Sequence, residues 1–179
     1  MEDASNQEIR KAIPVICLAG VLVFLFSGCA PLGSYSDEAL YTSDVESVYV
    51  EMFDNKTYQR GIEYDLTDAV AKRIESETPY KIVTDRNRAD TVLSGYVTSV
   101  GSSVLSVEQE SGRALEKESV LVAVVRWKNL KSGELLINDR EVRASASYSE
   151  WQNQGEDYAF SLAANKLARK ITELMETQW

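Results

Sequence analysis

The chain has 179 residues, and its 19 Lys and Arg against 28 Asp and Glu give a formal net charge of −9 at pH 7. This acidity argues against nucleic-acid binding, which requires clustered basic side chains. The chain has no histidine and only two cysteines, so the commonest general base and the commonest zinc ligands are absent or scarce. Composition therefore argues against an enzyme and against a bound metal or cofactor, and leaves only a carboxylate site open.

The first distinctive segment is an apolar run of 14 residues, 13–26, which follows Arg10 and Lys11 and ends at Ser27-Gly28-Cys29. A helix needs about 20 apolar residues to cross a bilayer, because each residue adds only about 1.5 Å. A short apolar run after basic residues and before small ones is typical of a secretory signal. Residues 1–28 are therefore predicted to be a signal peptide.

The end of this run, Leu25-Phe26-Ser27-Gly28-Cys29, resembles the lipobox of bacterial lipoproteins. The resemblance implies that the Cys29 thiol carries a diacylglycerol with chains such as palmitate, and that Cys29 becomes the first residue. Residues 29–44 would then be a lipidated N-terminus and linker, and residues 45–179 a single domain. Because Ala30 rather than Asp follows the cysteine, we expect the outer membrane, with the domain facing the periplasm. The alternative is an uncleaved apolar anchor or core helix with an incidental cysteine.

The next segments alternate between strand and helix patterns. Apolar and polar residues alternate in "VESVYVEMFDN", residues 45–55, which predicts a strand. From Tyr58 the apolar residues recur every three or four positions, which predicts a helix that faces a core and ends before Pro79. The residues of its apolar face are Ile62, Leu66, Ala69, Val70 and Ile74.

The second half is predicted to be mostly strand, closed by a helix. "YKIVTD" reads as a short strand, and residues 89–107 as a long one with Gly95 and Gly101 at bends or bulges. Residues 118–129 are apolar at almost every position from Val120 to Val125, which favours the sheet centre. Residues 142–148 alternate after a turn. The stripe of the closing helix is Phe160, Ala163, Ala164, Leu167, Ile171 and Leu174.

These elements predict an α+β fold, a two-layer sandwich with two helices packed on a four- to five-stranded mixed sheet. The expected order is β-α-β-β-β-α, with room for a fifth short strand. Leu66 and Leu167 are expected to be buried where the helices meet the sheet.

Two sequence motifs are shared with a known family. Phe53-Asp54-Asn55-Lys56-Thr57 runs into the first helix, and Ala89-Asp90-Thr91-Val92-Leu93-Ser94-Gly95 begins the long strand. With Cys29 and the terminal helix, they resemble the LptE-type lipopolysaccharide-assembly lipoproteins. The resemblance implies a plug and folding partner of a large LptD-type outer-membrane β-barrel, which also binds lipopolysaccharide.

Other envelope lipoproteins share these motifs, so two alternatives stay open. Activators of penicillin-binding proteins usually carry a long disordered tether, whereas only about 15 residues separate Cys29 from the first strand here, at most about 50 Å. CsgG-type secretion lipoproteins need pore-forming hairpins with an apolar lipid face, a pattern that is not obvious in residues 92–127.

The motif residues themselves, Phe53, Asn55, Thr57, Ala89, Asp90 and Gly95, are expected to be structural. Asn55 and Thr57 are suited to a strand-to-helix turn that caps the helix start. For lipopolysaccharide, whose phosphates and carboxylates favour Arg and Lys, the candidate contacts are Arg126, Trp127, Lys128 and Lys131. The alternative for this cluster is a solvated turn.

Overall fold

The computed structural model describes residues 40–176, so the predicted signal peptide and Cys29 lie outside the described residues. The described part contains one mixed sheet and two long helices. The strands are β1 (Ser47–Val50), β2 (Asp54–Asn55), β3 (Lys81–Ile82), β4 (Thr91–Val107), β5 (Ala114–Asn129) and β6 (Leu135–Tyr148). The helices are α2 (Ile62–Glu77) and α3 (Glu156–Glu173), with single 3-10 turns η2 (Arg86–Arg88) and η3 (Glu150–Gln152).

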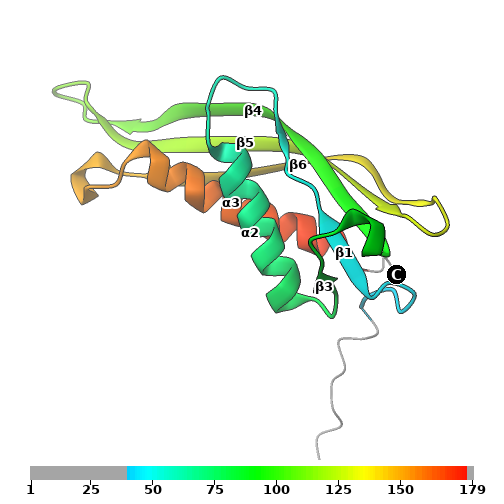
Figure 1. Ribbon diagram of the computed structural model, residues 1–179. Coiled ribbons are helices and arrows are strands. Elements are labelled where there is room, and N and C mark those ends of the chain that lie inside the picture. The colour runs from blue at the N-terminus through cyan, green and yellow to red at the C-terminus, as the bar shows by residue number, and fades with distance from the viewer. Residues whose placement is uncertain (1–39, 177–179) are drawn as a thin grey trace, which may run out of the picture. The chain divides into compact units, whose positions relative to one another are not determined.

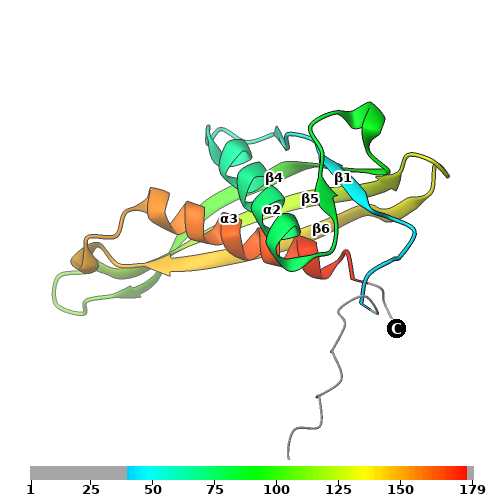
Figure 2. The ribbon, with the colours of Figure 1, turned by 60° about the horizontal axis from the view of Figure 1, so that its bottom comes forward.

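The sheet has the order β3-β1-β4-β5-β6, and the short β2 also pairs with β4. Strand β1 is parallel to both β3 and β4, whereas β4, β5 and β6 form an antiparallel meander. Both helices pack on the same face of the sheet (Figures 1 and 2). The predicted α+β sandwich is therefore confirmed, and the fifth short strand is β3. The sheet has a sixth strand, because the single strand expected over residues 45–55 is divided into β1 and β2.

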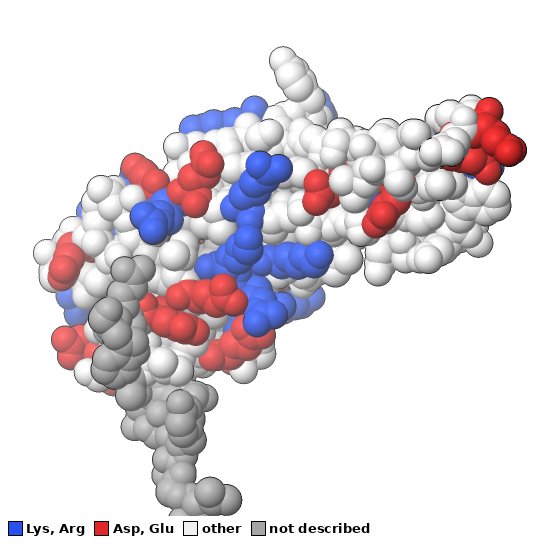
Figure 3. Space-filling model, turned by 180° about the vertical axis from the view of Figure 1, so that it is seen from behind, with Lys and Arg blue, Asp and Glu red and all other residues white. Residues whose placement is uncertain are grey.

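The core lies between this sheet face and the helices. Leu66 of α2 and Leu167 of α3 are fully buried, as their spacing predicted. Across from them, alternate residues of β5 are buried as well: Ser119, Leu121, Ala123, Val125 and Trp127. Neither α2 nor α3 lies on the opposite face of the sheet (Figures 1 and 2), which we call the open face; Figure 3 looks at the molecule from that side.

Three details differ from expectation. Strand β5 is interior, but β4 is the middle strand, because β1 and β3 add to the far side of β4. The apolar run of β5 is also covered by helices on one face only, and Val120 and Val122 remain half-buried on the open face. Helix α2 begins at Ile62 rather than at Tyr58, because Gly61 adopts a left-handed conformation (φ 95°) before the first turn.

Candidate functional site

The Ala89-Asp90 motif joins three parts of the sheet. The Asp90 Oδ2 atom accepts hydrogen bonds from the Ser47 backbone N–H (3.0 Å), the Ser47 hydroxyl (2.8 Å) and the Glu46 N–H (3.2 Å). Its Oδ1 atom lies 2.5 Å from Lys131 Nζ, in the turn between β5 and β6. The Asp90 carbonyl accepts from Leu130 N–H in the same turn. Asp90 therefore ties the start of β1 and the β5–β6 turn to the start of β4.

This environment stabilises the charged form of Asp90. The Lys131 ammonium is the largest cause, the Ser47 hydroxyl follows, and together with the backbone N–H groups they lower the pKa of Asp90 from 3.8 to about 2 against the opposing effect of burial. The Asp90 side chain is only 14% exposed, but Lys131 is 74% exposed. Solvent therefore screens the Lys131–Asp90 ion pair. The hydrogen bonds that Asp90 accepts from Ser47 and Glu46 contribute more to stability than the ion pair does.

Asp90→Asn is expected to lower the free energy of unfolding by about 1 to 2 kcal/mol at pH 7. Each unit by which folding lowers the pKa of Asp90 corresponds to about 1.4 kcal/mol of stability, and solvent screening of the exposed Lys131 reduces this contribution. Because the pKa is lower in the folded state, this stability is present above pH 3.8 and is lost as the pH falls toward 2. The difference between the variant and the wild type should therefore shrink below pH 4. Urea unfolding at pH 7 and pH 3 measures this difference in the free energy of unfolding, with Asp54→Asn at an exposed position as the control. If wild type and Asp90→Asn differ by the same amount at both pH values, the prediction is contradicted.

The Asn55-Lys56-Thr57 motif forms the turn after β2. The Asn55 Oδ1 atom accepts from the Thr57 N–H (2.8 Å) and hydroxyl (2.7 Å), and Asn55 Nδ2 donates to Gln59 O and Glu63 Oε2. The Glu63 carboxylate in turn accepts from the N–H of Gly61, the N-cap residue of α2. Asn55 and Thr57 therefore organise the turn, but they do not cap the helix directly as we expected.

Phe53 and Gly95 form a close contact under the sheet. Phe53 is 1% exposed. A Cβ atom on Gly95 would lie 2.6 Å from Phe53 Cε1 and 2.5 Å from the Val124 carbonyl oxygen. No side chain fits at this position, so Gly95 lets Phe53 pack against the centre of β4.

The four candidate ligand residues of the β5–β6 hairpin do not share one surface. Arg126 and Lys128 are exposed on the open face, whereas Trp127 between them is 2% exposed and faces the helices. Successive residues of a strand point to opposite faces, which separates them. Lys131 is engaged with Asp90.

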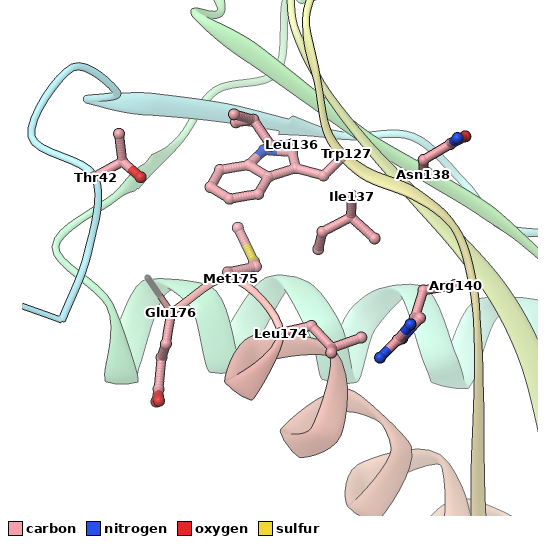
Figure 4. A pocket seen from close by; sticks show the side chains of 9 residues that line it. All are labelled: Thr42, Trp127, Leu136, Ile137, Asn138, Arg140, Leu174, Met175 and Glu176. Carbon is pink, nitrogen blue, oxygen red and sulfur yellow. The ribbon is translucent and has the colours of Figure 1, made fainter. Parts of the chain in front are cut away.

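Trp127 instead lines a cavity of about 390 Å³ beside the C-terminal end of α3 (Figure 4). Trp127 shares the apolar part of the wall with Met175, Ile137 and Leu174, and Leu136 adds to it. The remaining lining residues are Thr42, Asn138, Arg140 and Glu176. The indole also packs against Tyr80 at 5.7 Å between ring centroids. The cavity lies on the helix side, away from Arg126 and Lys128.

The open face carries a band of basic side chains, which we call the basic band: Lys56, Arg126, Lys128 and Arg143. Figure 3 shows basic residues across the middle of this face. The Lys56 ammonium lies 3.2 Å from the centroid of the Tyr96 ring. Arg143 pairs across the strands with Val122, and its neighbours Val142 and Ala144 are buried, so it points to the open face.

The members of the basic band differ in how they are neutralised. Arg126 forms a two-point ion pair with Asp139, Nε to Oδ1 at 3.0 Å and Nη2 to Oδ2 at 2.5 Å, which raises the pKa of Arg126. Within residues 40–176 no ion pair involves Lys128 or Arg143. Glu141 is exposed on the same face of β6 as Arg143, so the band has acidic neighbours. Lys128 and Arg143 are therefore the cations most available to an anionic ligand.

Sequence reasoning missed Lys56 and Arg143 as members of this surface. Arg143 had a signal, because it falls on the polar side of the alternating residues 142–148. Lys56 had none, because its place over Tyr96 depends on the parallel pairing of β2 with β4.

No helix between residues 40 and 176 is long and apolar enough to cross a membrane. Within the same residues, no group of three or more Cys, Asp or Glu side chains is placed to hold a metal ion.

Comparisons with known proteins agree with this fold. The sequence model of the LptE family, described as lipopolysaccharide assembly, matches residues 45–175. A hypothetical protein from Chlamydia trachomatis has a similar structure, with a TM-score of 0.52 and 9% identity over 72% of this chain and 94% of that chain. A protein from Xanthomonas campestris gives 0.51 and 13%, over 75% and 88%.

Uncharacterized lipoprotein B from Nitrosomonas europaea is 19% identical over 73% of this chain and 81% of that chain, with a TM-score of 0.48. No curated protein matches the sequence. The two similarities with TM-scores above 0.5 support the fold alone, whereas the family match covers most of the chain.

Proposed function

The chain belongs to the LptE lipopolysaccharide-assembly family, and on this premise we propose that it is an outer-membrane lipoprotein that partners a large LptD-type β-barrel. In this proposal residues 1–28 are removed as a signal peptide, Cys29 carries the lipid, and residues 29–44 link it to the domain of residues 45–179. The domain faces the periplasm, supports the barrel as plug and folding partner, and binds lipopolysaccharide without covalent chemistry. The family match is the observation that carries the assembly role.

The basic band supports the ligand part of the proposal. Lipopolysaccharide carries phosphates and carboxylates, and Lys and Arg side chains form charge-assisted hydrogen bonds with such groups. Lys128 and Arg143 have no ion-pair partner among residues 40–176. Val122, which pairs with Arg143, and Tyr96, which lies under Lys56, are partly exposed. The open face therefore offers both cations and apolar surface to an anionic glycolipid.

A double charge reversal tests this surface. Lys128→Glu with Arg143→Glu is expected to weaken binding of the purified lipoprotein to lipopolysaccharide aggregates roughly tenfold or more, about 1.4 kcal/mol or more of binding free energy. Wild-type binding should also weaken as salt rises, because charges are screened beyond about 8 Å at physiological ionic strength. Lys131 is left intact, since its reversal would place a carboxylate beside Asp90.

The matched control reverses two exposed cations on the helices, Lys72→Glu and Arg169→Glu, which changes the net charge equally on the other side of the sheet. If both double variants bind equally well, the open face is not the ligand site. If the wild type binds no lipopolysaccharide at all, only the barrel-partner role remains.

The alternative function is that of a periplasm-facing adaptor for another envelope machine, a penicillin-binding-protein activator or a CsgG-type secretion component. Purification of the lipidated protein from detergent-solubilised envelopes separates these functions. A large outer-membrane β-barrel that copurifies supports the assembly role. A penicillin-binding protein in its place supports the alternative.

A further inference from the structure

Strand β6 carries an extra residue where it passes Arg126 of β5. The register of the two strands shifts between Val125 and Trp127. Because of this shift, Asn138 and Asp139 of β6 lie together opposite Arg126 alone. Such a β-bulge re-aims the side chains of the strand that carries it. Asp139 has a φ of 43°, a left-handed conformation in which Asp and Asn occur more often than most other residues. The bulge therefore fixes where the Asp139 carboxylate points.

That carboxylate occupies the Arg126 guanidinium. Arg126 Nε donates to Asp139 Oδ1 at 3.0 Å, and Nη2 donates to Oδ2 at 2.5 Å. The two side chains are 50% and 45% exposed, and an ion pair as exposed as this contributes little to stability. The same two-point geometry is the one in which Arg side chains bind the phosphate or carboxylate of a ligand. Asp139 therefore takes the position that an anionic ligand would take on Arg126.

Arg126 is the neutralised cation of the basic band. Within residues 40–176 it is the only member of the band that forms an ion pair. Along the strands it lies between Lys128 and Arg143. Glu141 is also exposed on this face of β6, but no ion pair in the described part of the chain involves it. Figure 3 shows acidic side chains beside the basic ones on this face. Asp139 therefore neutralises one cation in the middle of the band and leaves its neighbours without a partner.

We propose that Asp139 competes with the ligand for Arg126, so that phosphate groups reach this guanidinium and carboxylate groups do not. The inference rests on the proposed binding of an anionic glycolipid by the basic band. It adds to that function a specificity-determining residue, which selects the kind of anionic group that the band accepts.

The charge of each group explains the selection. A phosphate monoester carries about −1.5 to −2 charges at pH 7 and three acceptor oxygens, whereas a carboxylate has a single charge and two oxygens. The phosphate therefore gains more than Asp139 does from Arg126, and Lys128 beside it adds to the attraction. Because Asp139 belongs to the same chain, its effective concentration at Arg126 is on the order of millimolar or higher. A ligand carboxylate of equal charge does not displace it.

Asp139→Asn tests the competition, because it removes the charge and Asn tolerates the left-handed backbone of the bulge as well as Asp does. Arg126 is then available before the ligand arrives. The affinity of the full lipidated chain for lipopolysaccharide aggregates should rise about three- to fivefold, the upper range expected for the loss of a competing exposed ion pair. The selection should weaken as well. When the phosphates of the lipopolysaccharide are removed with hydrofluoric acid, the wild type should lose more affinity than Asp139→Asn.

Glu141→Gln is the matched control, because it changes the net charge by the same amount on the same face of β6. Its affinity should stay within about twofold of the wild type, since Glu141 holds no cation of the band. In an Arg126→Gln background, Asp139→Asn should have no more effect than Glu141→Gln. If Asp139→Asn and Glu141→Gln raise the affinity equally, or if the gain survives without Arg126, the net charge of the face explains it and the proposal is overturned.

Asp139→Gly is the second variant, because glycine also adopts a φ of 43° without strain. It should reproduce the gain, and the urea midpoints of both variants should stay close to that of the wild type. Wild-type binding that neither variant increases would overturn this inference and leave the proposed ligand binding intact. An absence of binding by the wild type and by every variant would overturn both.

Discussion

Truncation of Leu66 or Leu167 to alanine is expected to lower the free energy of unfolding by about 2 to 5 kcal/mol in each case. Both side chains are fully buried, Leu66 on α2 and Leu167 on α3, where the helices meet the sheet. The loss combines the transfer free energy of the removed carbons with the cavity that remains. A domain of this size is typically stable by about 5 to 15 kcal/mol, so either variant should unfold at a clearly lower urea concentration.

Leu135→Ala is the matched control, because the same atoms are removed from a side chain that is 43% exposed. Its unfolding midpoint should stay within the range of surface substitutions, about 0.5 kcal/mol of the wild type. A midpoint for Leu66→Ala or Leu167→Ala as close to the wild type as that would mean that the helix faces are assigned wrongly.

The parts of the fold that the sequence predicts are those with a long periodic pattern. The stripe of α3 from Phe160 to Ile171 is buried, and the long strands β4 and β5 lie close to their expected ranges. Such patterns are decided by which face meets the core, so they can be read locally. The strand β2 has only two residues, and pairing with β4 alone defines it. No local pattern can reveal such a strand.

The start of α2 was predicted four residues too early for a related reason. The segment from Tyr58 to Arg60 is exposed, and the Asn55 side chain holds its backbone in a turn by bonding the Gln59 carbonyl. The apolar period of the helix was correct, but periodicity does not show where a polar turn gives way to a helix.

The candidate ligand residues show which contacts can be predicted from closeness in the sequence and which cannot. Alternation along a strand is enough to place Trp127 on the face opposite Arg126 and Lys128. The pairing of Lys131 with Asp90 joins residues 41 positions apart, and the approach of Lys56 to Tyr96 joins 40. Those contacts depend on the register of the sheet, so the structure was needed to assemble the basic band.

The sequence alone does not explain why a glycine occupies position 95, in the Ala-Asp strand motif. A bend or bulge was expected at Gly95, but the residue pairs regularly with Val125. Glycine is required there because the Phe53 ring and the Val124 carbonyl occupy the space of a side chain. The two motifs that suggested the family therefore meet at the Phe53–Gly95 contact.

The anchoring of the protein is tested by Cys29→Ala, which is expected to abolish lipidation completely. The thiol is the only group of the lipobox-like segment that can carry the diacylglycerol, and Cys17 lies inside the apolar run. Two acyl chains give a stable membrane anchor, since each buried methylene contributes about 0.8 kcal/mol. Without them, the variant should accumulate as an unprocessed precursor that incorporates no labelled palmitate.

Cys17→Ala is the control for this experiment, because it removes the other cysteine and leaves the lipobox-like segment intact. It should be labelled, shortened and recovered in outer-membrane fractions like the wild type. The precursor of Cys29→Ala keeps only the 14-residue apolar run 13–26, less than the roughly 20 residues of a membrane-spanning helix, so an alkaline wash should release it from membranes more readily. Normal processing and retention of Cys29→Ala would instead mean that the apolar segment itself anchors the chain and that the cysteine is incidental.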